Sequence, residues 1–212
     1  MNQFREKHYG LLAAKVIKGL ESRNMEGFYC ATKAQALEKA MEIIPQGAKV
    51  AWGGSVTLDE VGLKDAIMYG DFQLIDRGAA KTPEETRKAE LDSYAADYYL
   101  CSSNAISEDG ELVNIDGNAN RVSCIAYGPE HVVLVVGMNK VARDLDAAIA
   151  RARYEAAPIN NMRFHLNNPC HINGACANCK SADTICCQFL ITRYSRHKGR
   201  IKVILVGEQL GF

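Results

Sequence analysis

The sequence has no excess of charge of either sign and no long apolar run. Lysine and arginine total 25, as do aspartate and glutamate, so the formal net charge is zero. Nucleic-acid-binding proteins usually carry a basic face, and a chain with balanced charges gives no sign of one. A local basic patch is still compatible with this composition. No apolar run approaches the ~18 residues of a membrane span, and the polar residues 1–9 lack the apolar stretch of a secretory signal. We therefore expect a cytoplasmic protein with no nucleic-acid partner and no membrane partner.

Signatures of the common organic cofactors are also absent. The pair Gly53-Gly54 follows an apolar run, but the third glycine of a dinucleotide fingerprint and the lysine of a Walker loop are missing. The histidines are dispersed and show no HExxH spacing. We find no flavin, nicotinamide or pyridoxal signature in the sequence.

Apolar residues recur with helical spacing in some segments and form short continuous runs in others, and the two kinds of segment alternate. This alternation indicates a mainly parallel sheet flanked by helices, in the α/β class. We expect a single domain over residues 1–212, with an N-terminal helix at about 8–24 and a cysteine-rich insertion at about 157–200. The other expected helices are 32–44, 57–68, 140–156 and one that begins at 82, and the expected strands are 28–30, 49–52, 72–75, 97–101, 111–115, 122–127, 131–136 and 201–206.

Residues 53–57 read Gly-Gly-Ser-Val-Thr, between an expected strand and an expected helix. Backbone N–H groups at the start of a helix attract anions, and glycines let a ligand approach the backbone closely. The hydroxyls of Ser55 and Thr57 add further donors. The alternative is a tight turn with a serine or threonine cap. The candidate anion-binding residues here are Gly53, Gly54, Ser55 and Thr57.

Two further segments place cations beside polar loops. Asparagine, aspartate and glycine are dense over 114–121, as in loops that adopt left-handed conformations. The planar guanidinium of Arg121 suits a carboxylate or a phosphate. Lys140 lies near another helix start, where a cation is unfavourable unless it meets an anion. Polar turns with solvated cations are the alternative. The candidate ligand-binding residues in these segments are Asn118, Asn120, Arg121, Asn139 and Lys140.

Two neighbouring carboxylates, Glu108 and Asp109, precede Gly110 in a loop. Carboxylates in such a loop can act as acid, base or nucleophile, which makes both of them candidate catalytic residues. Asp-Gly is also a common turn dipeptide, and on these residues alone an ordinary hairpin turn is the favoured interpretation.

Five of the eight cysteines lie between residues 170 and 187. Cytosolic thiols are usually reduced, so this cluster indicates a metal site more than a disulfide framework. Four thiolates suit zinc, and they also suit an iron–sulfur cluster. The spacing matches neither a standard zinc finger nor the bacterial ferredoxin pattern, and redox-active or spare thiols are the alternative. The favoured ligands are Cys170, Cys176, Cys179 and Cys186, with Cys187 packing inward, although the residues leave the choice between Cys186 and Cys187 open.

Several blocks of the sequence together resemble the lactate-utilisation (LUD) domain family. The resemblance implies a fold related to ribose-5-phosphate isomerase, glucosamine-6-phosphate deaminase and the CoA-transferases. The acidic turn is similar to the Ser-Glu-Asn-Gly segment in which a CoA-transferase glutamate attacks a thioester, although Asp109 stands where that segment has asparagine. The blocks that carry the resemblance are residues 50–62, 104–110, 116–122, 127–129 and 136–140.

The resemblance implies a role in lactate or organic-acid utilisation. In that role the chain would bind a small anionic metabolite and support electron transfer through a cysteine-bound metal, together with iron–sulfur partner subunits. One alternative is a stand-alone enzyme that acts on a sugar phosphate or a CoA thioester, with Glu108 as base or nucleophile. Another is a ligand sensor without chemistry. The edge of an open sheet is compatible with a homodimer.

Overall fold

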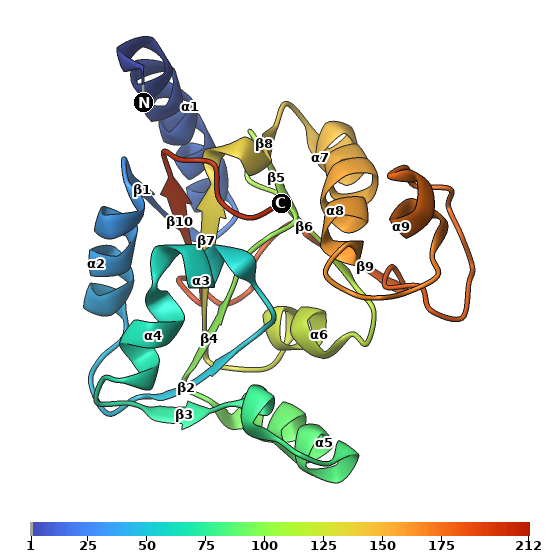
Figure 1. Ribbon diagram of the computed structural model, residues 1–212. Helices are drawn as coiled ribbons and strands as arrows, with labels where there is room; N and C mark the ends of the chain where they lie inside the picture. Colours follow the sequence, from blue (N-terminus) through green and yellow to red (C-terminus); the bar gives the residue numbers. More distant parts are fainter. Residues whose placement is uncertain (1) are drawn as a thin grey trace.

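A computed structural model describes residues 2–212, and a six-stranded sheet forms the centre of its α/β fold (Figure 1). Every strand pairing in this sheet is parallel, which confirms the fold class expected from the sequence. The strand order is β1-β10-β7-β4-β2-β3. The strands are β1 (Glu26–Cys30), β2 (Lys49–Trp52), β3 (Gln73–Ile75), β4 (Tyr98–Cys101), β7 (His131–Gly137) and β10 (Ile201–Val206).

Helices cover both faces of this main sheet. Side chains alternate between the two faces along each strand, so each central strand contributes to two buried clusters. In β7, Val132 and Leu134 belong to one buried cluster, whereas Val133 and Val135 belong to another. The first cluster includes residues of α1 and α6, and the second includes residues of α2, α3 and α4. These helices are α1 (Gln3–Ser22), α2 (Lys33–Ile43), α3 (Val56–Val61), α4 (Leu63–Met68) and α6 (Asn120–Ala126).

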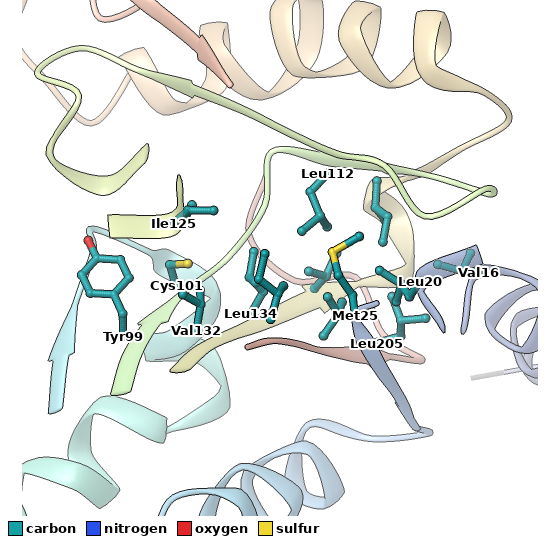
Figure 2. Packing of buried hydrophobic residues seen from close by; sticks show 14 of the residues in the cluster. Val16, Leu20, Met25, Tyr99, Cys101, Leu112, Ile125, Val132, Leu134 and Leu205 are labelled. Atoms are coloured by element: carbon teal, nitrogen blue, oxygen red, sulfur yellow. The ribbon is translucent and has the colours of Figure 1, made fainter. Parts of the chain in front are cut away.

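Figure 2 shows part of the cluster beneath α1 and α6. Leu20 of α1 packs in one cluster with Leu134 of β7 and Leu205 of β10, and Ile125 adds α6 to it. Leu20, Leu134, Leu205 and Ile125 are fully buried. Burying a leucine or isoleucine side chain contributes about 1.5–3 kcal/mol. This cluster therefore fixes α1 and α6 to the main sheet.

A second, four-stranded sheet lies beside the first, with the strand order β8-β5-β6-β9. Strand β6 pairs antiparallel with both β5 and β9, and β8 pairs parallel with β5. Ile106 and Leu112 of this sheet pack into the cluster beneath α1, whereas Val113 and Ile115 pack into a third cluster with α7 and α8. The elements are β5 (Ala105–Ser107), β6 (Leu112–Asp116), β8 (Val141–Ala142), β9 (Gln188–Thr192), α7 (Leu145–Arg151), a π-helical turn (Ala152–Ala156) and α8 (Ala157–Asn161).

Three expected elements differ from the structure. The helix expected at 140–156 begins only at Leu145, where Asp144 caps α7, because the residues before it form a 3₁₀ turn and strand β8. The strand expected at 122–127 is part of α6, which follows a left-handed residue, Ala119, with φ of +64°. Its buried residues Val122 and Ile125 lie three positions apart, a spacing that places both side chains on the core face of a helix. The helix expected at 57–68 is divided into α3 and α4, because Gly62 adopts φ of +78°.

The N-terminal helix and the cysteine-rich segment are also more extensive than the sequence predicts. Helix α1 begins earlier than the expected 8–24 because the Asn2 side chain accepts a hydrogen bond from the Phe4 N–H at 2.8 Å and caps the helix. The cysteine-rich segment expected at 157–200 contributes strand β9 to the second sheet. It also contains α9 (Pro169–Asn173). This segment is therefore joined to the rest of the fold by a full strand pairing.

The remaining elements lie mostly near the edge strand β3. They are α5 (Pro83–Asp92) and the short 3₁₀ turns η1 (Arg77–Ala79) and η2 (Ser93–Ala95), with a further 3₁₀ turn, η3 (Met138–Lys140), directly after β7. Within residues 2–212, none of the helices is both long and apolar enough to cross a membrane.

Candidate functional site

A cavity of about 400 Å³, called here the anion cavity, lies at the carboxyl ends of the main-sheet strands. The chain changes direction there: β2 leads outward to β3, whereas β4 leads to β7 on the other side. Open α/β sheets bind ligands in the crevice at such a reversal. Thr57 after β2, Ser102 after β4 and Lys140 after β7 all line the cavity. The strand order brings these distant residues together.

Lys140 is almost completely buried at the floor of the cavity, with 3% of its surface exposed. Its ammonium group donates hydrogen bonds to Thr57 Oγ1 at 2.9 Å and to Ser102 Oγ at 3.0 Å. Burial lowers the pKa of Lys140 to about 7, with a smaller contribution from Arg151, while Glu60 opposes the change. An amine that is half protonated near neutral pH can hold an anion or exchange a proton with a ligand.

The two glycines of the 53–57 segment have different roles. A Cβ on Gly53 would lie 2.9 Å from both Arg121 Cδ and Tyr99 Oη, so Gly53 lets the Arg121 stem pack against this turn. Gly54 has no atom within 4 Å of such a Cβ and lines the cavity. Ser55 also lines the cavity, and its hydroxyl accepts the Leu58 N–H at 3.3 Å as the N-cap of α3. The serine cap anticipated as an alternative is thus present.

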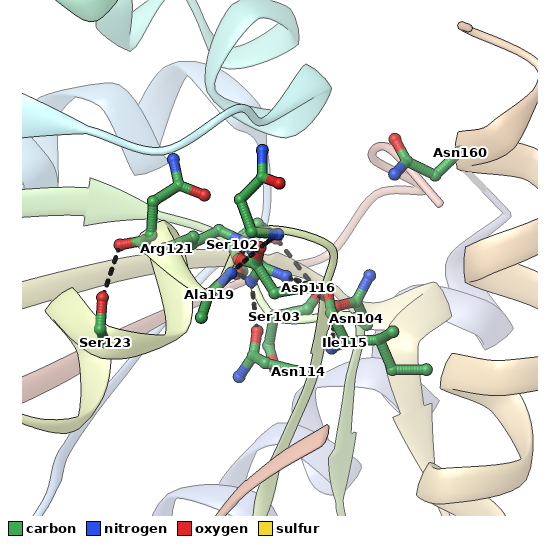
Figure 3. Close-up of polar contacts among 12 residues, drawn as sticks. Ser102, Ser103, Asn104, Asn114, Ile115, Asp116, Ala119, Arg121, Ser123 and Asn160 are labelled. Atoms are coloured by element: carbon green, nitrogen blue, oxygen red, sulfur yellow. Dashed lines mark hydrogen bonds and ion pairs between the residues drawn. The ribbon is translucent and has the colours of Figure 1, made fainter. Parts of the chain in front are cut away.

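The Arg121 guanidinium joins α6 to two other segments of the cavity wall (Figure 3). It donates to Asn114 Oδ1 at 2.6 Å and Ile115 O at 2.6 Å in β6. It also donates to Asn104 Oδ1 at 3.1 Å and Ser102 O at 3.2 Å in the loop after β4. These four acceptors are neutral oxygens, and Asp116 is the carboxylate paired with the guanidinium, so Arg121 holds the wall in place while Asp116 offsets part of its charge.

The loop between β6 and α6 is organised by Asp116. Its Oδ1 accepts the N–H groups of Asn118 at 3.1 Å and Ala119 at 3.0 Å, and its Oδ2 lies 3.6 Å from Arg121 Nε. This side chain-to-backbone turn lets Ala119 adopt its left-handed conformation. Asn118 and Asn120 line the cavity beside it.

Basic side chains outnumber acidic ones on the cavity wall. Arg77 forms an ion pair with Glu90 at 3.2 Å, and Arg163 donates to Asn160 Oδ1 at 3.1 Å. Arg77 and Arg163 join Arg121 and Lys140 as lining residues, whereas Asp116 is the single acidic residue among the described lining residues. The cavity therefore favours a negatively charged ligand.

Most of the expected ligand-binding residues meet at this cavity. Gly53 and Asn139 stand behind the wall: Asn139 Oδ1 accepts the Leu210 N–H at 3.1 Å and thereby holds the segment after β10. That segment places Gly211 at the cavity, and the Gly211 N–H donates to Glu60 at 2.7 Å. The expected residues that line the cavity are Gly54, Ser55, Thr57, Asn118, Asn120, Arg121 and Lys140.

The acidic turn does not join them. Glu108 forms an ion pair with Lys15 of α1 at 2.5 Å, and Asp109 forms one with Arg23. Gly110 has φ of +89°, and its backbone packs against Gly19 of α1. Helix α1 therefore holds both carboxylates away from the anion cavity, and neither Glu108 nor Asp109 is among its lining residues.

Four of the clustered cysteines surround a second cavity of about 50 Å³, called here the thiol cavity. The expectation that Cys187 packs inward is wrong: Cys187 is exposed outside this cavity, because its thiol points to the Thr184 carbonyl at 3.5 Å. No group of three His, Cys, Asp or Glu side chains in residues 2–212 is already arranged to hold a metal ion. The cysteines at the thiol cavity are the four expected as ligands, Cys170, Cys176, Cys179 and Cys186.

Several lining residues of the anion cavity were not anticipated. Ser102 and Asn104 directly follow a buried strand, and their position at a strand's carboxyl end is a signal that sequence reasoning could have used. Arg163, Phe164 and Thr184 carry no such signal. They reach the cavity only because the segment after α8 folds back over the second sheet.

Comparisons with known proteins agree with this architecture. A search of curated proteins finds no match. A solved structure described as a DUF162 family protein from Deinococcus radiodurans aligns with a TM-score of 0.54 and 10% identity, covering 93% of this chain and 98% of that one. At this identity the likeness shows the fold alone. The LUD domain family matches residues 13–206. The chain therefore belongs to the LUD domain family, a membership that supports a role related to lactate utilisation in general.

Proposed function

We propose that the chain acts in the utilisation of lactate or another organic acid by binding a small anionic metabolite in the anion cavity. The observation that carries this proposal is the buried Lys140, whose polar partners in the structure are the hydroxyls of Thr57 and Ser102. A buried ammonium paired only with neutral groups is costly. A carboxylate beside Lys140 would offset that cost and complete the site.

The remaining cations define how an acid would be oriented. Arg121 is fixed by its hydrogen bonds, so its position is rigid, and Asp116 offsets part of its charge. Arg163 is exposed, donates a hydrogen bond to Asn160 Oδ1 and lies over the Phe164 ring at 5.7 Å. A carboxylate at Lys140 with its second polar group toward Arg163 would use both cations. The cavity volume lies within the range of about 300–1,000 Å³ that is typical of small-molecule sites.

Binding an anion beside Lys140 also moves a proton. The pKa of Lys140 is lowered to about 7 by burial, so part of the population is neutral near pH 7. A bound carboxylate favours the ammonium form, so the amine takes up a proton as the ligand binds. Lys140 is then positioned to return that proton to a ligand oxygen.

Isothermal titration calorimetry with L-lactate and pyruvate tests the proposal, with lactamide as an uncharged analogue of lactate. We expect the acids to bind and lactamide to bind at least tenfold more weakly. Lys140→Met should reduce the affinity for the acids by a similar factor. Lys18→Met removes an exposed lysine of α1 and should leave binding unchanged. Equal binding of lactate and lactamide would contradict the proposal.

The alternative of a stand-alone enzyme with Glu108 as base or nucleophile has less support. Glu108 is paired with Lys15 and lies outside the anion cavity, so a substrate bound there would not meet its carboxylate. The ligand-sensor alternative uses the same cavity and differs only in the absence of turnover. Iron–sulfur partner subunits, a homodimer and a cytoplasmic location stay predictions. The electron-transfer role depends on which metal the cysteines bind.

A further inference from the structure

The thiol cavity is lined by four cysteines from three separate parts of the cysteine-rich segment. Cys170 comes from α9, Cys176 and Cys179 come from the following loop, and Cys186 precedes β9. Cys187, next in sequence to Cys186, is exposed and faces elsewhere. Of the Cys186-Cys187 pair, Cys186 therefore lines the cavity and Cys187 does not.

The loop around these thiols is built on a buried asparagine. Asn168 is 1% exposed, and its amide donates to Asn161 Oδ1 at 3.0 Å and to the Asp183 carbonyl at 2.9 Å. Ser181 donates to Asn168 Oδ1 at 2.5 Å and lies 3.7 Å from Cys179 Sγ. Asn168 thus ties the start of α9 to the end of α8 and to residues 181–183, which lie between Cys179 and Cys186.

Two left-handed residues shape the turns between the thiols. Gly174 has φ of +76° and ends α9, and Asn178 has φ of +52° between Cys176 and Cys179. A left-handed asparagine in a two-residue gap turns the flanking cysteines back toward the same point. The backbone therefore holds a geometry that suits neighbouring ligands of one ion.

The donors that the thiol cavity offers are sulfur atoms. Its described lining contains no carboxylate, and Arg153 is its one charged side chain. Thiols bind a metal ion as thiolates, and binding releases their protons to water.

We propose that a single zinc ion binds in the thiol cavity, ligated by Cys170, Cys176, Cys179 and Cys186. Four thiolates form the tetrahedral sulfur shell of structural zinc, with a metal–sulfur distance of about 2.3 Å. The thiol cavity, at about 50 Å³, is much smaller than the anion cavity of about 400 Å³, and we assign it one ion.

This zinc ion would have a structural role next to the anion cavity. Thr184 and Ile185 line both cavities, so the segment that carries Cys186 forms a wall between them. Zinc binding would hold that wall in place. Zinc carries no redox chemistry, so this assignment makes the chain an acid-binding protein with a structural metal and leaves electron transfer to other proteins.

Metal analysis of the full-length protein tests the assignment. The protein is purified without chelators and without added metal, and zinc, iron and acid-labile sulfide are measured per chain. We expect about one zinc and no sulfide. Cys186→Ser should lower the zinc content severalfold, whereas Cys187→Ser, the matched control one residue away, should retain it.

Titration of the stripped wild-type protein with Co²⁺ covers the case in which Cys186→Ser fails to fold. Tetrahedral thiolate coordination gives an intense absorption with one Co²⁺ per chain, and Zn²⁺ should displace it. Iron with sulfide, the absence of stoichiometric metal, or equal zinc loss in both variants would overturn the proposal. No organic acid is present in these measurements, so their failure would leave the proposed function of the anion cavity untouched.

Discussion

The Lys140 ammonium nitrogen lies 2.9 Å from the Thr57 hydroxyl oxygen, at the floor of a cavity lined by basic residues. Within residues 2–212, no carboxylate lies within ion-pairing distance of this nitrogen, and its second partner is the hydroxyl of Ser102. Proteins rarely bury a cation without an acidic partner, because its desolvation is not compensated. The arrangement therefore has consequences for stability and for binding.

The first consequence is a pH-dependent stability. Below pH 7 both folded and unfolded chains carry the Lys140 proton, so the folded state bears the full cost of burying the charge. Between about pH 7 and 10.5 the unfolded chain holds a proton that the folded chain has released, so the free energy of unfolding rises with pH. Relative to Lys140→Met, wild type should gain about 2–3 kcal/mol between pH 6 and pH 9.

Urea unfolding of both proteins at pH 6, 7.5 and 9 measures this difference. Lys18→Met, which removes an exposed lysine, should show no such trend. A difference between wild type and Lys140→Met that stays constant over this range would mean that Lys140 does not titrate near neutral pH.

The second consequence is that acid binding should be linked to proton uptake. The ligand carboxylate stays ionised because such groups titrate near pH 4, whereas the ammonium form of Lys140 is lost as pH rises above about 7. The affinity for lactate or pyruvate should fall by about tenfold or more between pH 6.5 and pH 8.5. Calorimetry in buffers of different ionisation enthalpy counts the protons taken up. Lys140→Met should bind weakly with no pH dependence, and a steep dependence in that variant would contradict the assignment.

The neighbouring glycines Gly53 and Gly54 allow a matched comparison. Alanine at Gly53 would place its Cβ 2.9 Å from Arg121 Cδ, a carbon of a side chain fixed by four hydrogen bonds. We expect Gly53→Ala to lower the free energy of unfolding by about 1–3 kcal/mol. Gly54→Ala meets no atom within 4 Å, so stability should hardly change while its methyl group narrows the cavity and weakens acid binding. Equal destabilisation by the two variants would argue against the Arg121 packing.

Arg121→Lys tests the wall of the cavity. A lysine ammonium cannot reach the four acceptors that the guanidinium serves in two segments, so buried oxygens would lose their partners. The free energy of unfolding should fall by roughly 2–4 kcal/mol. Arg196→Lys changes an exposed arginine and should be neutral in the same denaturation experiment. A neutral Arg121→Lys would show that these hydrogen bonds contribute little.

Removal of zinc should weaken the wall shared by the two cavities. Limited proteolysis of chelator-treated protein should cut within residues 170–187 several times faster than in the zinc-loaded protein. The affinity for the organic acid should also fall, because Thr184 and Ile185 line the anion cavity. Cys187→Ser should respond to the chelator as wild type does. An unchanged rate of proteolysis after complete zinc removal would show that the metal does not stabilise this wall.

The sequence by itself determined the layered α/β class, because the information for it is local. The continuous apolar runs of β7 and β10 reflect strands buried on both faces, and the helix beginning at Thr82 was predicted from proline at its first turn. Short segments carry less local information: residues 122–127 are apolar enough for a strand, and only their packing against the main sheet makes them part of the helix α6.

Only the tertiary structure decided which polar residues share a site. The strand order places Thr57, Ser102 and Lys140 at one edge, although they lie far apart in the chain. The same folding places α1 over the acidic turn, so that Lys15 pairs with Glu108 at a distance from the cavity. Such choices depend on long-range packing, which carries no local periodicity. The pattern of residues can nominate a lysine or a glutamate for chemistry, but burial and partners assign the role.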